Sequence, residues 1–98
     1  MEKITTKEVR QILAEHIDCE KFKSELAKKS DEELLKTNIQ EEFELDSLDR
    51  MDMLTTLYTR HRIWIEERAM AKSSFHKEPT VENFIKMVND YEEFKESA

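Results

Sequence analysis

The 98-residue chain contains no glycine, one proline and one cysteine. Hairpins and sheet corners rely on glycine for positive φ angles, so its absence argues against a β-rich fold and favours helices. A glycine-rich phosphate-binding loop is excluded for the same reason. The single cysteine, Cys19, excludes an internal disulfide, and we expect it to be a free thiol that is buried or half-buried.

Long apolar runs are missing as well. No stretch approaches the roughly 18 consecutive apolar residues of a membrane-spanning helix, and residues 1–5 lack the basic start and apolar run of a signal peptide. We therefore expect a cytoplasmic protein with a single domain over residues 1–98, and a monomer.

Acidic residues outnumber basic residues in the chain. Twenty-three acidic and 16 basic residues give a net charge of −7, and charged residues make up 40% of the chain. This excess repels the phosphates of nucleic acids, so nucleic-acid binding is not expected and basic protein partners are favoured.

Capping signals and the 3.6-residue period of apolar positions predict five helices. Their ranges are about 5–17, 31–36, 47–61, 66–73 and 80–95. Two capping boxes mark helix starts, Thr5 with Glu8 and Ser30 with Glu33, and Asp46 is a favourable N-cap for the helix that follows it.

The remaining stretches read as connections. Residues 18–45 form a long charged connection with one short helix inside it, and residues 74–79 form a polar one. The pattern of residues 62–65 would permit a short strand, but no second convincing strand exists to pair with them. We expect an extended loop there, with one of its apolar residues packing inward.

Each longer helix carries one apolar stripe, and such stripes can be buried only against each other. For the helix at 47–61 the predicted interior residues are Met51, Leu54, Leu57, Tyr58 and His61. For the last helix they are Val81, Phe84, Ile85, Val88 and Tyr91. The expected fold class is all-α, a small helical bundle.

The segment Asp46-Ser47-Leu48-Asp49 has the features of an attachment site for a phosphate-linked group. Such a site needs an exposed hydroxyl on a rigid element, close to positive potential that accommodates the diester. A serine directly after the N-cap of a helix meets these needs, because the helix N-terminus carries partial positive charge and free N–H groups.

The surroundings of Ser47 favour protein recognition. Between residues 41 and 52 six acidic residues and one basic residue, Arg50, give a local charge of −5. A basic partner surface would be steered to this end of the domain. The expected partner-binding residues are Asp46, Leu48, Asp49, Met51 and Asp52.

Catalysis by the chain itself is not expected. The three histidines, His16, His61 and His76, share no metal-ligand spacing, so no metal site is expected. Ser47 lacks an evident paired base, and no catalytic residue is predicted. An unmodified acidic adaptor remains the alternative: it would bind a protein partner through the helix at 47–61, with Asp46-Ser47 as an ordinary helix start.

With these residues in place, the chain resembles the acyl carrier protein family. The family pattern Asp-Leu-Gly-Ala-Asp-Ser-Leu-Asp aligns with Glu42-Phe43-Glu44-Leu45-Asp46-Ser47-Leu48-Asp49. Downstream, Met51, Leu54 and Leu57 are similar to the family's second helix, and the stretch from Thr80 is similar to its fourth. The likeness spans nearly the whole chain in the same order.

The resemblance implies a four-helix bundle with a long first loop that contains a short extra helix. It implies that Ser47 carries phosphopantetheine, donated from coenzyme A by a phosphopantetheinyl transferase. The arm would hold acyl groups as thioesters for acyl-activating, acyl-transfer or synthase enzymes. An aliphatic chain could be sheltered inside the bundle by Met51, Leu54, Tyr58 and Ile85.

The chain also departs from the family pattern. Glu44 stands where the family has glycine, and Arg50, Arg60 and Arg62 occupy positions where many relatives carry acids. These departures favour a specialised fatty-acid or polyketide-like pathway with its own partners over a housekeeping synthase.

Overall fold

The computed structural model describes residues 4–97 and the side chains of residues 4–90, and this part of the chain is helical apart from connections and one isolated backbone bridge. The elements are α1 (Thr6–His16), α2 (Glu20–Lys28), α3 (Asp31–Leu35), α4 (Ile39–Phe43), α5 (Ser47–His61), α6 (Glu67–Lys72), α7 (Ser74–Lys77) and α8 (Val81–Ser97). The predicted all-α class is confirmed. None of these helices combines the length and apolar character that a bilayer crossing requires.

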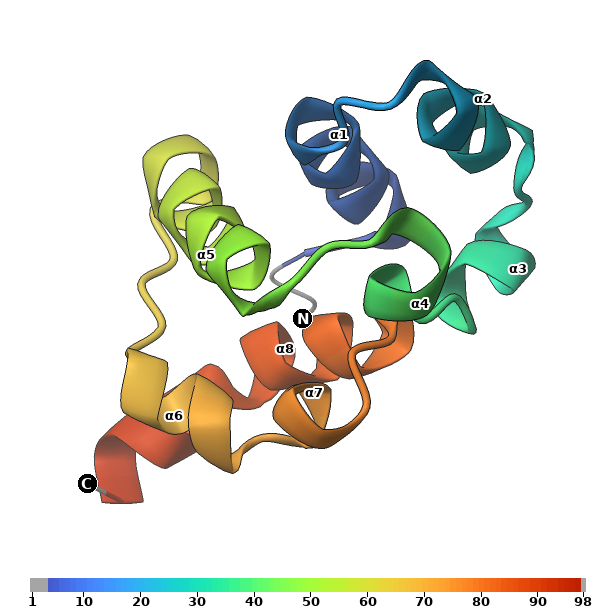
Figure 1. Cartoon of the computed structure of the whole chain (residues 1–98). Helices are drawn as coiled ribbons and strands as arrows, with labels where there is room; N and C mark the ends of the chain where they lie inside the picture. The colour runs from blue at the N-terminus through green and yellow to red at the C-terminus, as the bar shows by residue number, and fades with distance from the viewer. Residues whose placement is uncertain (1–3, 98) are drawn as a thin grey trace.

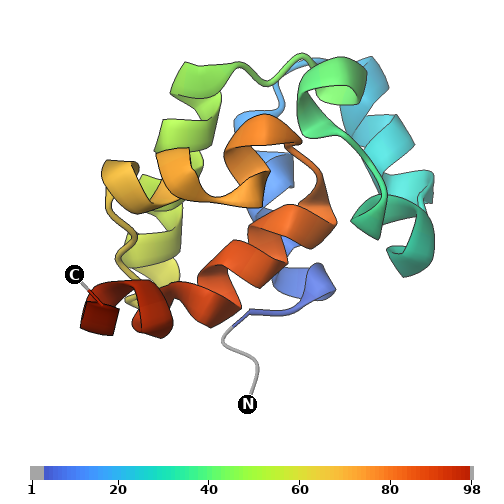
Figure 2. The same cartoon turned by 90° about the horizontal axis from the view of Figure 1, so that it is seen from below.

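The three longest helices frame the molecule. Helix α1 lies beside α5 and also contacts α8, which runs beneath it (Figure 1). Helices α2, α3 and α4 gather on the side of α1 away from α5, while α6 and α7 pack on α8 (Figure 2). Helix α1 is therefore the central element, and α5 has one side against α1 and another toward solvent.

The core contains buried apolar residues of α1, α5 and the shorter helices, and the stripe that the sequence predicts for α8 contributes to it. Val81, Phe84 and Val88 are buried and Ile85 is half-buried, whereas Tyr91 lies outside the described side chains. The expected inward residue of the loop at 62–65 is Ile65, which is buried.

The prediction of a single short helix between residues 18 and 45 is wrong, because α2 and α4 lie there as well. Helix α2 offers a weak sequence signal: its N-cap is Cys19, with no side-chain cap bond, and only Phe22 and Leu26 repeat at helical spacing. Tertiary contacts stabilise it instead. Leu26 is buried, and the rings of Phe22 and Phe43 meet edge to face at 6.0 Å.

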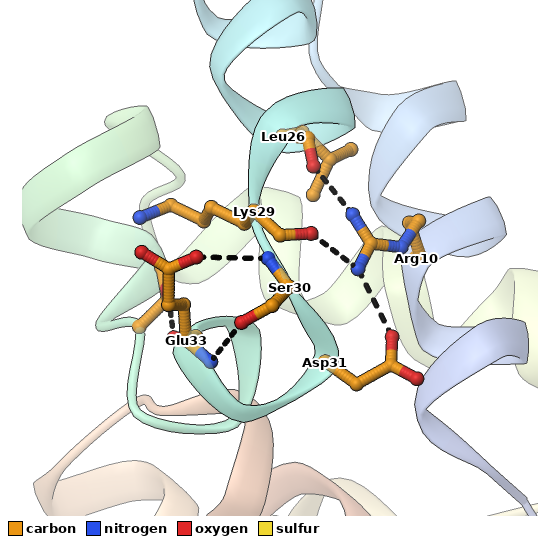
Figure 3. A network of polar contacts seen from close by, with 7 residues as sticks. Arg10, Leu26, Lys29, Ser30, Asp31 and Glu33 are labelled. Atoms are coloured by element: carbon orange, nitrogen blue, oxygen red, sulfur yellow. Dashed lines mark hydrogen bonds and ion pairs between the residues drawn. The ribbon is translucent and has the colours of Figure 1, made fainter.

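Arg10 joins α1 to the end of α2 and the start of α3 (Figure 3). Its guanidinium donates to the carbonyl oxygens of Leu26 and Lys29 at the end of α2, and it contacts Asp31 at 3.1 Å. A cation at a helix C-terminus also complements the helix dipole. One side chain of α1 thus fixes the position of the α2–α3 turn.

Two further expectations are wrong. Residues 74–79 are not merely a polar connection, because α7 forms there and its Phe75 is fully buried, 5.2 Å from the ring of Phe84. Cys19 is exposed rather than buried, since it precedes α2 on the surface.

The predicted interior face of α5 is wrong in part. Leu54 and Leu57 are buried as expected, but Tyr58 is exposed, and Met51 and His61 are only half-buried. The buried residues of α5 are Arg50, Met53, Leu54 and Leu57. The face is rotated because α5 packs on α1 from one side, which the apolar pattern of α5 alone does not specify.

The helix caps differ in how well they were predicted. The Ser30–Glu33 capping box is confirmed at α3, and Thr80 accepts the Asn83 N–H at 3.2 Å at the start of α8. The box predicted for Thr5 is wrong: the Thr5 hydroxyl donates to the Glu8 carboxylate instead of capping the backbone of α1.

Two residues adopt the left-handed conformation that glycine normally occupies. Glu44 (φ 58°) ends α4 and Arg62 (φ 58°) follows α5. A side chain with a Cβ is strained in this region by about 1–2 kcal/mol. The glycine-free chain therefore bears this cost at both ends of α5.

We expect Glu44→Gly to raise the free energy of unfolding by about 1 kcal/mol, because glycine relieves the left-handed strain. Chemical denaturation measures the change. The matched control is Ala14→Gly on the exposed surface of α1, which should lower stability by about 1 kcal/mol. Destabilisation by both substitutions would contradict the strain at residue 44.

Candidate functional site

The segment that leads into α5 is held in place by backbone hydrogen bonds and by packing. The N–H of Ile39 donates to the carbonyl of Pro79 at 2.9 Å, and the N–H of Val81 donates to Thr37 at 3.2 Å. These bonds tie the start of α4 to the start of α8. Ile39, Phe43 and Leu45 are buried. The approach to α5 is consequently fixed by packing and by backbone bonds.

A reciprocal cap begins α5. Asp46 Oδ1 accepts the N–H of Asp49 at 3.0 Å, and Asp49 Oδ2 accepts the N–H of Asp46 at 3.1 Å. The predicted N-cap is thus confirmed, with the additional reciprocal bond from Asp49. Both carboxylates are engaged with the backbone, so the first turn of α5 is rigid.

The cap lowers the pKa of the Asp46 carboxyl below its ordinary value of 3.8. The largest cause is the hydrogen bond from the backbone N–H of Asp49, and the Leu48 N–H and the positive charge of Arg50 lower it further. These interactions favour the ionised carboxylate.

Ser47 occupies the first helical position after this cap and is exposed. No described residue forms a hydrogen bond with its hydroxyl, so the oxygen is open to another protein. Its Cβ is fixed by the capped turn. An exposed, uncommitted hydroxyl on a rigid turn fits the covalent attachment of a phosphopantetheine group.

The helix N-terminus contributes less to this fit than the sequence suggested. The N–H of Asp49 is already bonded to the Asp46 carboxylate, and the N–H of Asp46 to the Asp49 carboxylate. A phosphate on Ser47 would therefore find the helix dipole but few free donors. The phosphate of an attached group would therefore be held mainly by its covalent bond to Ser47 rather than by backbone donors.

The residues predicted to bind a partner share the first two turns of α5. Asp46, Leu48 and Asp52 are exposed, and the side chain of Leu48 is 72% accessible. Asp49 and Met51 are half-buried, Asp49 because it serves the cap. Leu48 is therefore the main apolar contact that this end of α5 can offer.

Arg50 has a role that the sequence analysis missed. Its side chain is only 7% exposed, and its guanidinium donates to the Gln40 side-chain oxygen at 2.8 Å. It joins α5 to α4 and adds positive charge beneath the Asp46 carboxylate. The signal in the sequence was its position as the only base in an acidic segment.

Polar contacts fix α5 against α1. His16 Nε2 lies 2.8 Å from the Thr56 hydroxyl, and His61 Nδ1 lies 3.5 Å from a Glu8 carboxylate oxygen. Arg60 forms an ion pair with Glu15. His16 is thus a packed residue at the boundary between α1 and α5. No group of described histidine, cysteine and acidic residues could hold a metal ion.

An exposed aromatic pair lies at the far end of α5. Tyr58 and Trp64 meet edge to face with ring centroids 5.5 Å apart, and the Arg62 guanidinium lies 6.0 Å from the centre of the Tyr58 ring. Together with Leu48 they are the large apolar residues exposed in the described chain. Sequence reasoning missed this pair because Tyr58 shares the stripe of Leu54. The signal in the sequence for this surface was the absence of acidic residues between residues 53 and 65.

An open hollow of about 450 Å³ lies elsewhere, beside α3 and α4. Its lining is Lys29, Glu33, Lys36, Thr37, Asn38, Glu41 and Glu42. Lys29 and Glu42 already form an ion pair at 3.3 Å, so this hollow has no strong preference for either sign of charge.

The lowered pKa of Asp46 predicts acid-dependent stability. Since the folded value lies below 3.8, the stabilisation is complete well above pH 3.8 and is lost as pH falls through the folded value. We expect the difference in unfolding free energy between the native chain and Asp46→Asn to shrink over that range. Asp18→Asn, in the exposed α1–α2 connection, is the control. A difference that does not vary with pH would contradict the cap.

Comparisons with protein-family models, with curated proteins and with solved structures found no match to this chain.

Proposed function

We propose that this chain is an acyl carrier protein whose Ser47 bears phosphopantetheine. The observation that carries the proposal is the exposed Ser47 hydroxyl at the first position of a rigidly capped helix, inside a segment of charge −5. When bound, the group supplies a thiol that holds acyl groups as thioesters.

The attachment reaction follows from the chemistry of serine. The Ser47 oxygen attacks the phosphorus that bears the pantetheine part of coenzyme A, and an oxygen–phosphorus bond forms. The anhydride bond to adenosine 3′,5′-bisphosphate breaks, and that nucleotide leaves with the electron pair. The serine proton passes to a base of the transferase, since no described residue of this chain bonds the hydroxyl.

The arrangement of helices is compatible with the carrier fold. Helices α1, α5, α6 and α8 correspond in order to the four helices that the resemblance implies. Helices α2, α3 and α4 then occupy the long first loop, and α7 is an addition before α8. We place the chain in a specialised fatty-acid or polyketide-like pathway, because Glu44, Arg60 and Arg62 depart from the pattern of the acyl carrier protein family.

The unmodified adaptor is the competing function, and the exposed Leu48 would suit it too. The two differ in what they require of Ser47. An adaptor needs an apolar and acidic face on α5, whereas a carrier also needs the hydroxyl. Experiments on Ser47 therefore separate them.

We expect incubation with coenzyme A, Mg²⁺ and a broad-specificity phosphopantetheinyl transferase to add the mass of one phosphopantetheine to the chain. Intact-mass spectrometry measures the product. Ser47→Ala should abolish the addition without unfolding the domain, because Asp46 and Asp49 form the cap without Ser47. Ser24→Ala, on the exposed surface of α2, should be modified like the native chain. A folded native chain that no transferase modifies would favour the adaptor.

Acidic residues around Ser47 should steer basic partners. We expect Asp52→Lys to lower kcat/KM for the transferase by up to about ten-fold at low salt, and by less as added salt screens the charges. Asp52 is preferred to Asp49 because it is exposed and outside the cap. Glu25→Lys on α2 makes the same change of charge far along the chain and should have little effect. Equal effects of the two substitutions would contradict docking at α5.

A further inference from the structure

We propose that the arm on Ser47 lies along the exposed face of α5 and that its acyl end rests on the aromatic pair Tyr58–Trp64, a platform suited to an aromatic acyl group. This inference depends on the proposed function of Ser47. It identifies a second site on the same helix and a class of cargo.

The two sites lie on one side of α5. Ser47 and Tyr58 are eleven positions apart, which is close to three helical turns, so both project in nearly the same direction. The rise of the helix separates them by about 16 Å. Both side chains are exposed, at opposite ends of the same face.

The surface between them has little charge. Leu54 lies closest to the line between Ser47 and Tyr58 but is buried against the core. The accessible lane along α5 therefore passes over half-buried Met51 and exposed Thr55. Leu48 and Asp52, both exposed, lie at the margin of this lane. The hydroxyls of Thr55 and Thr59 donate to the carbonyls of Met51 and Thr55 within the helix. Their polarity is thereby partly satisfied, and the lane can accept a chain of methylenes and amides.

The reach of the arm matches this distance. From the serine oxygen to the thiol sulfur there are about fourteen bonds, comparable to between four and five residues of extended peptide, which span about 16 Å. The sulfur of an arm laid along α5 therefore comes close to Tyr58. An acyl group on that sulfur would then lie at the Tyr58–Trp64 pair.

The shape of the platform favours a flat cargo. The two rings stand at 83° to one another and are 44% and 54% exposed, so they form an open corner on the surface. An open corner covers the face or edge of a planar ring, but it cannot enclose a long flexible chain. Aromatic groups prefer these edge-to-face and offset arrangements.

The platform is held in place by its surroundings. Ile65 is buried and anchors the loop that carries Trp64, and the left-handed Arg62 turns the chain back beside α5. The guanidinium of Arg62 lies near the Tyr58 ring. Arg60 is paired with Glu15, so Arg62 is the cation that a π-rich acyl group would meet at the pair.

Trp64 is the only tryptophan in the chain, which makes it a direct reporter. The transferase is supplied with benzoyl-coenzyme A, cyclohexanecarbonyl-coenzyme A or octanoyl-coenzyme A, and loading is measured by mass. Each loaded protein is then studied by NMR at the Trp64 indole N–H and by nuclear Overhauser contacts to the acyl protons. We expect a shifted indole signal and contacts for benzoyl, and much weaker effects for the saturated ring and the linear chain.

Substitutions then locate the cargo. Tyr58→Leu keeps an apolar side chain but removes the ring, and it should reduce the docked population by about two- to ten-fold. Thr55→Asp places a charge in the lane and should reduce it as well. Gln11→Asp, on the exposed face of α1, is the matched control and should change nothing.

The outcomes separate the two proposals. A chain that accepts no arm overturns both. A benzoyl-loaded chain with an unperturbed Trp64 overturns only the platform. Equal shifts for benzoyl and cyclohexanecarbonyl overturn the aromatic class of cargo, and docking that survives both Tyr58→Leu and Thr55→Asp overturns the path along α5.

Discussion

The reciprocal hydrogen bonds between Asp46 and Asp49 are the constraint on which the functional surface depends. They determine the residue at which α5 begins, and so they place Ser47 at its first helical position. Buried Leu45 precedes the cap and buried Arg50 follows it, so the turn cannot shift along the chain without exposing one or the other. Ser47 is exposed because it lies between these two anchors.

The contacts of α5 with α1 complete this arrangement. The buried apolar residues of α5 form the middle of its interface with α1. Polar pairs such as His16 with Thr56 and Arg60 with Glu15 lie at the edges of that interface. This leaves one face of α5 to the core and one to solvent. The solvent face carries Leu48 at its start and Tyr58 near its end, so a helix that is structural on one side can recognise other molecules on the other.

The absence of glycine shapes both ends of that helix. Glu44 and Arg62 adopt left-handed conformations that glycine would adopt without strain, and the packing of Leu45 and Ile65 next to them holds the backbone there. Sharp turns on either side give α5 a defined length. The same turn that strains Arg62 returns the chain so that Trp64 meets Tyr58.

The sequence by itself determined the all-α class, the N-cap at Asp46, the stripe of α8 and the acidic segment around Ser47, because these follow from local capping chemistry and from the helical period. Only the tertiary structure decided where α2 and α7 form, since Leu26 and Phe75 are buried by packing against other helices, Phe75 against Phe84 of α8. It also decided that Arg50 is buried and Tyr58 exposed. Helical periodicity gives the spacing of residues around a helix, but the side that is covered depends on the neighbour that packs against it.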